Sequence, residues 1–125
     1  KGPSRVSPFF IPAAIANLAP GWISMNYGIK GPNFTITSAC ASGVHSIGEA
    51  YNYIRFGITD QMIAGGAESV VSPMAIAGFS NMKALSTRND SPTEASRPWD
   101  KDRDGFVLGE GSAAFVLESL ESALK

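Results

Sequence analysis

Phe34-Thr35-Ile36-Thr37-Ser38-Ala39-Cys40-Ala41-Ser42-Gly43 is the stretch of sequence that decides the fold. Residues 34–38 are rich in β-branched side chains and follow a turn signal at 30–33, a pattern typical of a strand. After Cys40, apolar residues recur at helical spacing as far as Arg55, and Gly57 follows as a stop signal. The sequence therefore predicts a strand, a sharp turn that carries the chain's only cysteine, and a helix.

This arrangement places Cys40 at a helix N-terminus, where unpaired backbone N–H groups and the positive end of the helix dipole favour a thiolate. The same N–H groups can hold the oxyanion that forms when a thiolate attacks a thioester carbonyl. A lone cysteine among alanines also fits a second interpretation, a small buried hydrophobic residue. The spacing by itself does not decide between a nucleophile and a core residue.

The rest of the chain alternates helical and strand-like segments. One helix is predicted from Ile11 to about Tyr27, with a kink or break at Pro20-Gly21. A short buried strand over 60–67 would form a right-handed βαβ unit with the strand 34–38, the two strands being parallel. Further on we expect a helix over 73–84, an irregular loop over 86–105, a strand over 112–118 and a helix over 120–125. This order indicates an α/β fold, and no domain boundary is predicted within it.

Composition excludes several classes of protein. Ten basic and eleven acidic side chains among 125 residues give a net charge of −1, so no global field attracts nucleic acid or an anionic membrane. No apolar run has the length of a membrane span, and the first residues do not form a signal peptide. A single cysteine cannot form an internal disulfide, which fits a reducing compartment and a cytoplasmic location.

Two further patterns could carry chemistry. His45, the only histidine, stands about 140° around the helix from Cys40, so direct pairing of the two is not expected. Residues 100–105 copy the start of an EF-hand calcium loop, but its twelfth position is Gly111 instead of an acid, and no flanking helices are predicted. A calcium-binding module at 100–111 is therefore a minor alternative. With one cysteine and one histidine, no metal site is expected.

Several motifs together resemble one known family, in its order along the chain. They occupy residues 2–10, 37–43, 64–68, 84–89, 97–100 and 105–111. They resemble the β-ketoacyl-acyl-carrier-protein synthases, most closely the elongating KAS II type. The resemblance implies a thiolase-like fold, part of a layered αβαβα architecture in which a mixed sheet is flanked by helices. Because the family's proteins are several times longer, residues 1–125 are expected to be an incomplete N-terminal β-ketoacyl synthase domain without its C-terminal half.

The resemblance also implies particular site residues and partners. Cys40 matches the nucleophile. Phe10 matches the position that closes the fatty-acyl pocket of the neighbouring subunit, and Phe79 matches another wall position of that pocket. Ala39, beside Cys40, could also line the acyl channel, and the pattern alone fits ordinary core packing for all three apolar residues. Arg5 and Lys83 match basic positions that receive the acyl carrier protein, although Ser4 stands where the family often has another basic residue. The family forms a homodimer in which the nucleophile strand, here 34–38, pairs with its counterpart.

The function implied by the resemblance is decarboxylating Claisen condensation in fatty-acid elongation. Substrates arrive on the phosphopantetheine of the acyl carrier protein, and no further cofactor is expected. The family's second half supplies two histidines and a lysine, so residues 1–125 alone are expected to be acylated at best and not to condense. The alternative from another class is a noncatalytic partner subunit of a synthase pair, although such subunits lack the nucleophile.

Overall fold

The computed structural model describes residues 2–125, which form two compact units. The first unit comprises the residues up to Gly65 together with Ala114–Lys125, and the second comprises Gly66–Ala113. Strands β1 (Gln61–Glu68) and β2 (Gly111–Glu118) each begin in one unit and end in the other. Each unit is described by itself below.

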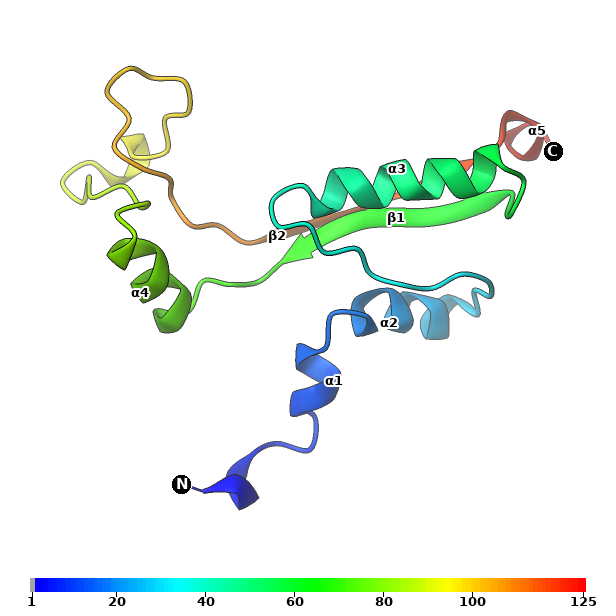
Figure 1. The fold of residues 1–125 in the computed structure, drawn as a ribbon, viewed down its shortest axis with the longest axis horizontal. Helices are drawn as coiled ribbons and strands as arrows, with labels where there is room; N and C mark the ends of the chain where they lie inside the picture. Colours follow the sequence, from blue (N-terminus) through cyan, green and yellow to red (C-terminus); the bar gives the residue numbers. More distant parts are fainter. Residues whose placement is uncertain (1) are drawn as a thin grey trace. The chain divides into compact units, whose positions relative to one another are not determined.

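The first unit opens with helices that are shorter than the sequence predicts. A 3-10 turn, η1 (Pro3–Arg5), is followed by α1 (Phe10–Ala14) and α2 (Leu18–Tyr27) (Figure 1). The helical stretch is thus broken before Leu18, and the predicted break at Pro20-Gly21 is wrong. Pro20 lies in the first turn of α2, where a missing N–H removes no intrahelical hydrogen bond. Gly28 ends α2 with φ 64°, as predicted.

Helix α3 (Ser42–Arg55) confirms the helix predicted after the cysteine. Gly57 has φ 69° and follows its last turn, in agreement with the stop signal at that position. Figure 1 shows α3 lying along β1, and the N–H of Gly65 on β1 donates to the Ser46 hydroxyl on α3 at 3.4 Å. Ala50 on α3 and Ala64 on β1 are both buried.

The sheet has two strands, β1 and β2, and the contacts at its two ends show that they run antiparallel. At one end the Ser119 N–H, just beyond β2, donates to the carbonyl of Asp60, just before β1. At the other end the carboxylate of Glu110 accepts from the Val71 N–H. Strands over 60–67 and 112–118 are therefore confirmed to within a residue at each end.

The predicted strand at 34–38 is not formed, so the predicted parallel βαβ unit is wrong for the described residues. Apart from a bridge between Ser38 and Cys40, the segment is extended without a neighbouring strand. A strand needs a second strand to satisfy its backbone groups, and no part of the described chain supplies one here. Side chains anchor the segment instead, because Asn33 Nδ2 donates to the Pro20 carbonyl at 3.1 Å and Thr35 Oγ1 to the Ala16 carbonyl at 3.2 Å.

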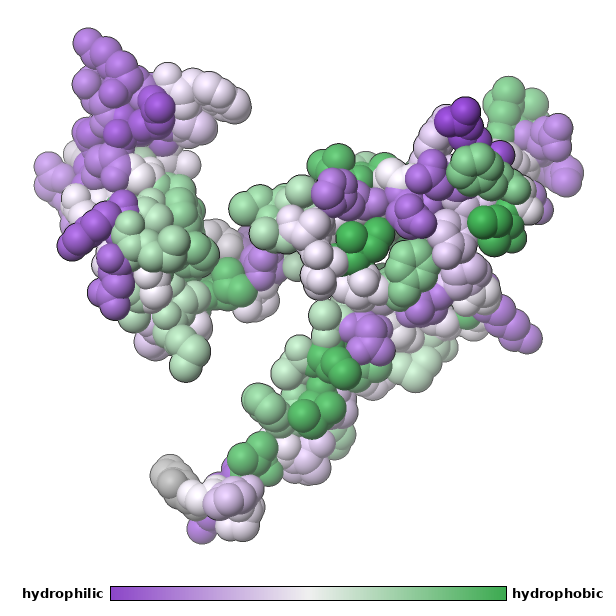
Figure 2. Space-filling model, viewed as in Figure 1, coloured by the Kyte–Doolittle hydropathy of each residue, from purple (hydrophilic) through white to green (hydrophobic). Residues whose placement is uncertain are grey.

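Few side chains of the described chain are buried. Those of Ala50, Ala64 and Ala95 are the buried apolar ones, so β1 carries one buried residue and is not the buried strand that the sequence predicts. Large apolar side chains are exposed instead, including Phe9 at 73% and Ile11 at 62%. Figure 2 shows hydrophobic residues on the surface over α1. None of the helices in residues 2–125 is long and apolar enough to cross a membrane.

The second unit contains α4 (Pro73–Asn81), a 3-10 turn η2 (Pro92–Glu94) and a long irregular loop. Helix α4 begins as predicted, with the Ser72 hydroxyl accepting from the Ala75 N–H at 3.3 Å. It ends at Asn81, before the predicted Ala84, because Lys83 adopts a left-handed φ of 59°. The predicted irregular loop is confirmed, and its two ends meet where Leu85 forms a bridge with Phe106.

Candidate functional site

A turn at residues 38–42, here called the cysteine elbow, carries Cys40 immediately before α3. The N–H of Ala41 donates to the Ser38 carbonyl at 3.2 Å, and the N–H of Ser42 donates to the Ala39 carbonyl at 3.0 Å. Ala39 has φ 52°, in the left-handed region that residues with a Cβ rarely adopt. The chain therefore reverses sharply at Cys40, as the sequence predicts.

Cys40 is a free cysteine and is exposed. It precedes Ala41, the N-cap of α3, so it lies where the first backbone N–H groups of a 14-residue helix are available. The alternative interpretation, a small buried hydrophobic cysteine, does not agree with this exposure. The geometry is that of an accessible thiol at a helix N-terminus.

The elbow is closed by hydroxyl groups that the sequence analysis did not single out. The Ser42 hydroxyl accepts from the Ser38 N–H at 2.8 Å and donates to the Ala39 carbonyl at 2.7 Å. The Ser38 hydroxyl shares a hydrogen bond of 2.6 Å with His45 Nδ1. The signal in the sequence is the spacing Ser38, Ser42 and His45, which places two hydroxyls and an imidazole around one turn.

His45 therefore has Ser38 as its partner, and no hydrogen bond joins it to Cys40 in the described residues. This agrees with the prediction that the two side chains do not pair directly. His45 is also exposed on α3.

The other predicted site residues are spread over both units. Phe10 begins α1 and is 55% exposed, and Ala39 lies in the cysteine elbow. Phe79 lies on α4 in the second unit, where its ring meets the Phe106 ring edge-on at 5.2 Å between centroids and 78° between planes. Of the basic residues, Arg5 ends η1 in the first unit, whereas Lys83 follows α4 in the second. Within one unit, the structure places Ala39 next to Cys40.

The acidic residues of the EF-hand-like segment are held by the protein's own donors. Asp104 accepts from the Ser86 hydroxyl at 2.7 Å and from the Thr87 N–H at 2.9 Å, and these bonds lower the pKa of its carboxyl group below the ordinary 3.8. The N–H of Asp102, followed by the Arg97 guanidinium, likewise lowers the pKa of Asp100. No cluster of three or more His, Cys, Asp or Glu residues within residues 2–125 could hold a metal ion.

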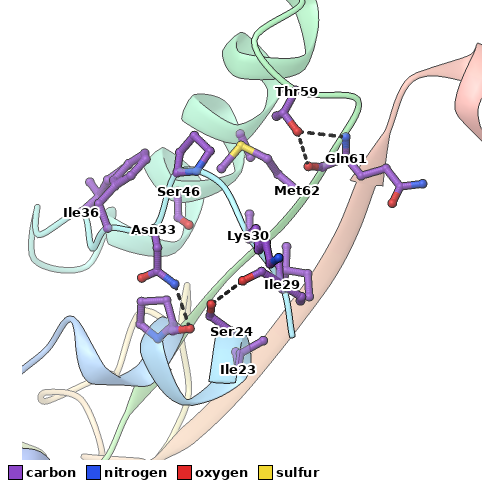
Figure 3. A pocket seen from close by; sticks show the side chains of 16 residues that line it. Ile23, Ser24, Ile29, Lys30, Asn33, Ile36, Ser46, Thr59, Gln61 and Met62 are labelled. Atoms are coloured by element: carbon purple, nitrogen blue, oxygen red, sulfur yellow. Dashed lines mark hydrogen bonds between the residues drawn. The ribbon is translucent and has the colours of Figure 1, made fainter. Parts of the chain in front are cut away.

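A hollow of about 110 Å³ lies in the first unit between α2, α3 and β1 (Figure 3). Apolar side chains such as Ile23 and Ile36 line it together with polar groups such as Asn33 and Ser46. It is smaller than the roughly 300–1,000 Å³ typical of small-molecule sites. None of the three predicted acyl-pocket residues lines it, so it is not the predicted acyl pocket.

Comparison with protein families gives a match over nearly all of the chain. The family model described as beta-ketoacyl synthase, N-terminal domain, matches residues 1–123. A relative named 3-oxoacyl-[acyl-carrier-protein] synthase 2 from Coxiella burnetii is 56% identical over 99% of this chain and 30% of its own length. A mitochondrial 3-oxoacyl-[acyl-carrier-protein] synthase from Arabidopsis thaliana is 57% identical over 95% of this chain and 26% of its own length. The chain thus spans about 30% of the length of the curated relatives it matches.

Solved structures agree with this match. A beta-ketoacyl synthase from Burkholderia phymatum superposes with a TM-score of 0.87 at 41% identity, covering 95% of this chain and 29% of that one. A type II PKS acyl-carrier protein in complex with its ketosynthase bound to the hexaketide gives a TM-score of 0.91 at 32% identity, covering 98% and 30%. These neighbours confirm the predicted α/β, thiolase-like fold, to which the described residues contribute two strands and the helices beside them.

Proposed function

We propose a function for this chain from its family, since it belongs to the β-ketoacyl synthases. The chain carries the nucleophile of a 3-oxoacyl-[acyl-carrier-protein] synthase that acts in fatty-acid elongation. The observation that carries the proposal is the accessible thiol of Cys40 at the N-terminus of α3, on an elbow that the family motif predicts. The chain covers about 30% of its relatives, so the activity proposed here belongs to the whole protein.

The first half-reaction is acyl transfer to Cys40. The thiolate attacks the carbonyl of an acyl thioester on the carrier protein's phosphopantetheine, and the pantetheine thiol leaves. An enzyme thioester remains on Cys40, so that one difficult transfer is divided into two easier steps. Backbone N–H groups at the start of α3 can stabilise the oxyanion of the tetrahedral intermediate.

The second half-reaction is decarboxylating condensation. Malonyl-carrier protein loses carbon dioxide, and the resulting carbanion attacks the acyl carbonyl on Cys40. The 3-oxoacyl-carrier protein forms and the Cys40 thiolate is released. The family resemblance assigns the support of this step to two histidines and a lysine outside residues 1–125, and no cofactor beyond phosphopantetheine takes part.

The proposed partner is an acyl carrier protein, with Arg5 and Lys83 receiving its acidic surface. Two observations support it: the relatives bear the carrier protein in their names, and a neighbouring ketosynthase was solved in complex with one. Opposite charges of this kind steer association of the two proteins. Phe10, Ala39 and Phe79 are proposed to line the acyl pocket; all three are apolar, and Ala39 is adjacent to Cys40.

We also propose a homodimer in which the extended segment 34–38 pairs with its counterpart in a second copy. The segment has strand composition but no neighbouring strand in the described residues, so most of its backbone groups are free for such pairing. The proposed place of action is the cytoplasm, in line with the single cysteine, which forms no internal disulfide.

The noncatalytic-partner alternative is less well supported. One structural neighbour is described as a ketosynthase/chain length factor, with a TM-score of 0.84 at 36% identity. However, Cys40, the residue proposed as the nucleophile, is present in this chain and is exposed. A calcium-binding module at 100–111 is not favoured either, because Asp104 already accepts hydrogen bonds from Ser86 and Thr87.

Intact mass spectrometry after incubation of the whole protein with a long-chain acyl-carrier protein tests the proposal. The expected result is an acyl adduct on the wild-type protein that is absent from Cys40→Ala, followed by 3-oxoacyl product when malonyl-carrier protein is added. A folded whole protein that forms no adduct would contradict the nucleophile assignment and favour the noncatalytic partner. Calorimetric titration with calcium gives the parallel test of the calcium alternative, for which we expect no binding heat.

A further inference from the structure

The backbone of the cysteine elbow is held in an unfavourable conformation. Ala39, directly before Cys40, has φ 52°. In this region the Cβ atom crowds the following carbonyl oxygen, so a residue with a side chain stays there only where other interactions hold it. The position of Cys40 therefore depends on bonds that fix Ala39.

The hydroxyl of Ser42 makes two such bonds at once. It accepts from the Ser38 N–H at 2.8 Å and donates to the Ala39 carbonyl at 2.7 Å. The two bonds join the residues before Cys40 to the first residue of α3, so they close the chain around the cysteine. The two backbone hydrogen bonds of the same turn, from the Ala41 N–H and the Ser42 N–H, are longer, at 3.2 Å and 3.0 Å.

A second contact ties the elbow further along α3. The Ser38 side chain shares a 2.6 Å hydrogen bond with His45 Nδ1, and the His45 N–H donates to the Ala41 carbonyl at 2.9 Å. Ser38 is therefore held through its N–H by Ser42 and through its hydroxyl by His45. Both attachments belong to α3, so the elbow is bonded to the helix N-terminus at two points.

We propose that Ser42 is a positioning residue for acyl transfer to Cys40, an inference that rests on the function proposed above. Its hydroxyl holds Ala39 in the left-handed conformation and so keeps Cys40 directly before the N-terminus of α3. In this role the Ser42 hydroxyl acts through its bonds to Ser38 and Ala39 and not on the substrate itself. Its loss should slow the transfer step without weakening the binding of the acyl-carrier protein.

The test uses four variants of the whole synthase. Ser42→Ala removes the hydroxyl, and the pair Ser42→Thr and Ser42→Val compares side chains of similar shape with and without it. Ser46→Ala is the matched control on the same helix, since the Ser46 hydroxyl contacts the Gly65 N–H and not the elbow. Four quantities are measured: kcat and KM for acylation by acyl-carrier protein, the rate of Cys40 alkylation by iodoacetamide, and the urea midpoint of unfolding.

We expect Ser42→Ala and Ser42→Val to lower kcat for acylation by roughly tenfold to a hundredfold, the loss typical of a misplaced reacting group, with KM unchanged. Ser42→Thr should restore most of the rate, and Ser46→Ala should keep the wild-type rate. A wild-type kcat in folded Ser42→Ala, or equal losses in the Thr and Val variants, would overturn the positioning role. The positioning role would also be overturned if Ser42→Ala and Ser42→Val failed to fold while Ser42→Thr folded, because the hydroxyl would then be needed for folding itself.

The alkylation measurement separates this inference from the proposed function. If wild-type protein forms no acyl adduct, the proposed function fails, and with it the role of Ser42 in acyl transfer. A slower alkylation of Cys40 in Ser42→Ala, restored in Ser42→Thr, would then show that the hydroxyl still positions the thiol. If wild-type protein is acylated and Ser42→Ala matches it in both assays, the inference alone is contradicted.

Discussion

Gly105 lies so close to Leu85 that a Cβ atom added to Gly105 would stand 2.3 Å from the Leu85 carbonyl carbon. Its φ of 148° is also one that residues with a side chain rarely adopt. The backbone of Leu85 cannot give way easily, because it is bridged to Phe106 next to Gly105. We expect Gly105→Ala to lower the free energy of unfolding by about 3 kcal/mol, measured by urea unfolding of the whole protein.

Gly109→Ala is the control for this prediction. A Cβ atom at Gly109 meets nothing within 4 Å, so the change should cost less than about 1 kcal/mol. Equal effects of the two substitutions would mean that the close approach of Gly105 to Leu85 does not hold the loop.

Acid should weaken the loop through Asp104. Bonds from the Ser86 hydroxyl and then the Thr87 N–H lower the pKa of its carboxyl group below 3.8 in the folded chain. A lowered pKa means that the carboxylate favours the folded state at pH values above 3.8, and that this contribution is lost as the pH falls through the folded pKa. We expect Asp104→Asn to make stability depend less steeply on pH in this acidic range.

The measurement is the urea midpoint followed from neutral pH down to the acid limit of folding. Asp90→Asn serves for comparison, since Asp90 lies on the same loop and its carboxylate accepts no hydrogen bond in the described residues. An unchanged slope in Asp104→Asn, or the same change in Asp90→Asn, would contradict the assignment.

The contribution of the N-cap of α4 to stability can be measured by substituting Ser72. Its hydroxyl accepts from the Ala75 N–H at 3.3 Å while its backbone is extended, with φ −133° and ψ 156°. We expect Ser72→Ala to lower the free energy of unfolding by about 1 kcal/mol. Ser72→Asp should keep most of the stability of the wild-type protein, since a carboxylate also accepts this hydrogen bond. Ser80→Ala, inside the same helix, should change stability by less than about 0.5 kcal/mol. A loss in Ser80→Ala as large as in Ser72→Ala would argue against a specific cap.

The edge-on contact between Phe79 and Phe106 should appear as an energetic coupling. With ring centroids 5.2 Å apart and planes at 78°, the pair is expected to contribute about 1 kcal/mol beyond the burial of each ring. Unfolding of Phe79→Leu, Phe106→Leu and the double variant gives this coupling as the departure from additivity. Additive losses would mean that the rings stabilise the chain independently.

The helix α3, the strands β1 and β2 and the start of α4 could all be predicted from the sequence because each depends on local signals. Apolar spacing fixes α3, Gly57 marks its end, and Pro73 after a serine marks the start of α4. The elbow before α3 could be predicted for the same reason, since strand composition changes to helical spacing at Cys40.

Features that depend on distant partners could not be predicted. Residues 34–38 have the composition of a strand, but a strand forms only where a neighbour accepts its hydrogen bonds, and composition does not report that. Likewise, a proline breaks a helix only when it lies in the helix interior. Pro20 lies in the first turn of α2 because the helical stretch is already broken before Leu18, where the sequence signal is weak. The Ser42 bonds were missed because a serine in this position is equally consistent with simple close packing.

The anchoring of residues 33–35 links the segment before Cys40 to α2. Asn33 is bonded to the Pro20 carbonyl in α2, and Thr35 to the Ala16 carbonyl just before it. Without a strand ladder, these two side chains hold residues 33–35 in place. Because both bonds reach the α2 region, a displacement of α2 would be expected to act on residues 33–35, which lead directly into the cysteine elbow.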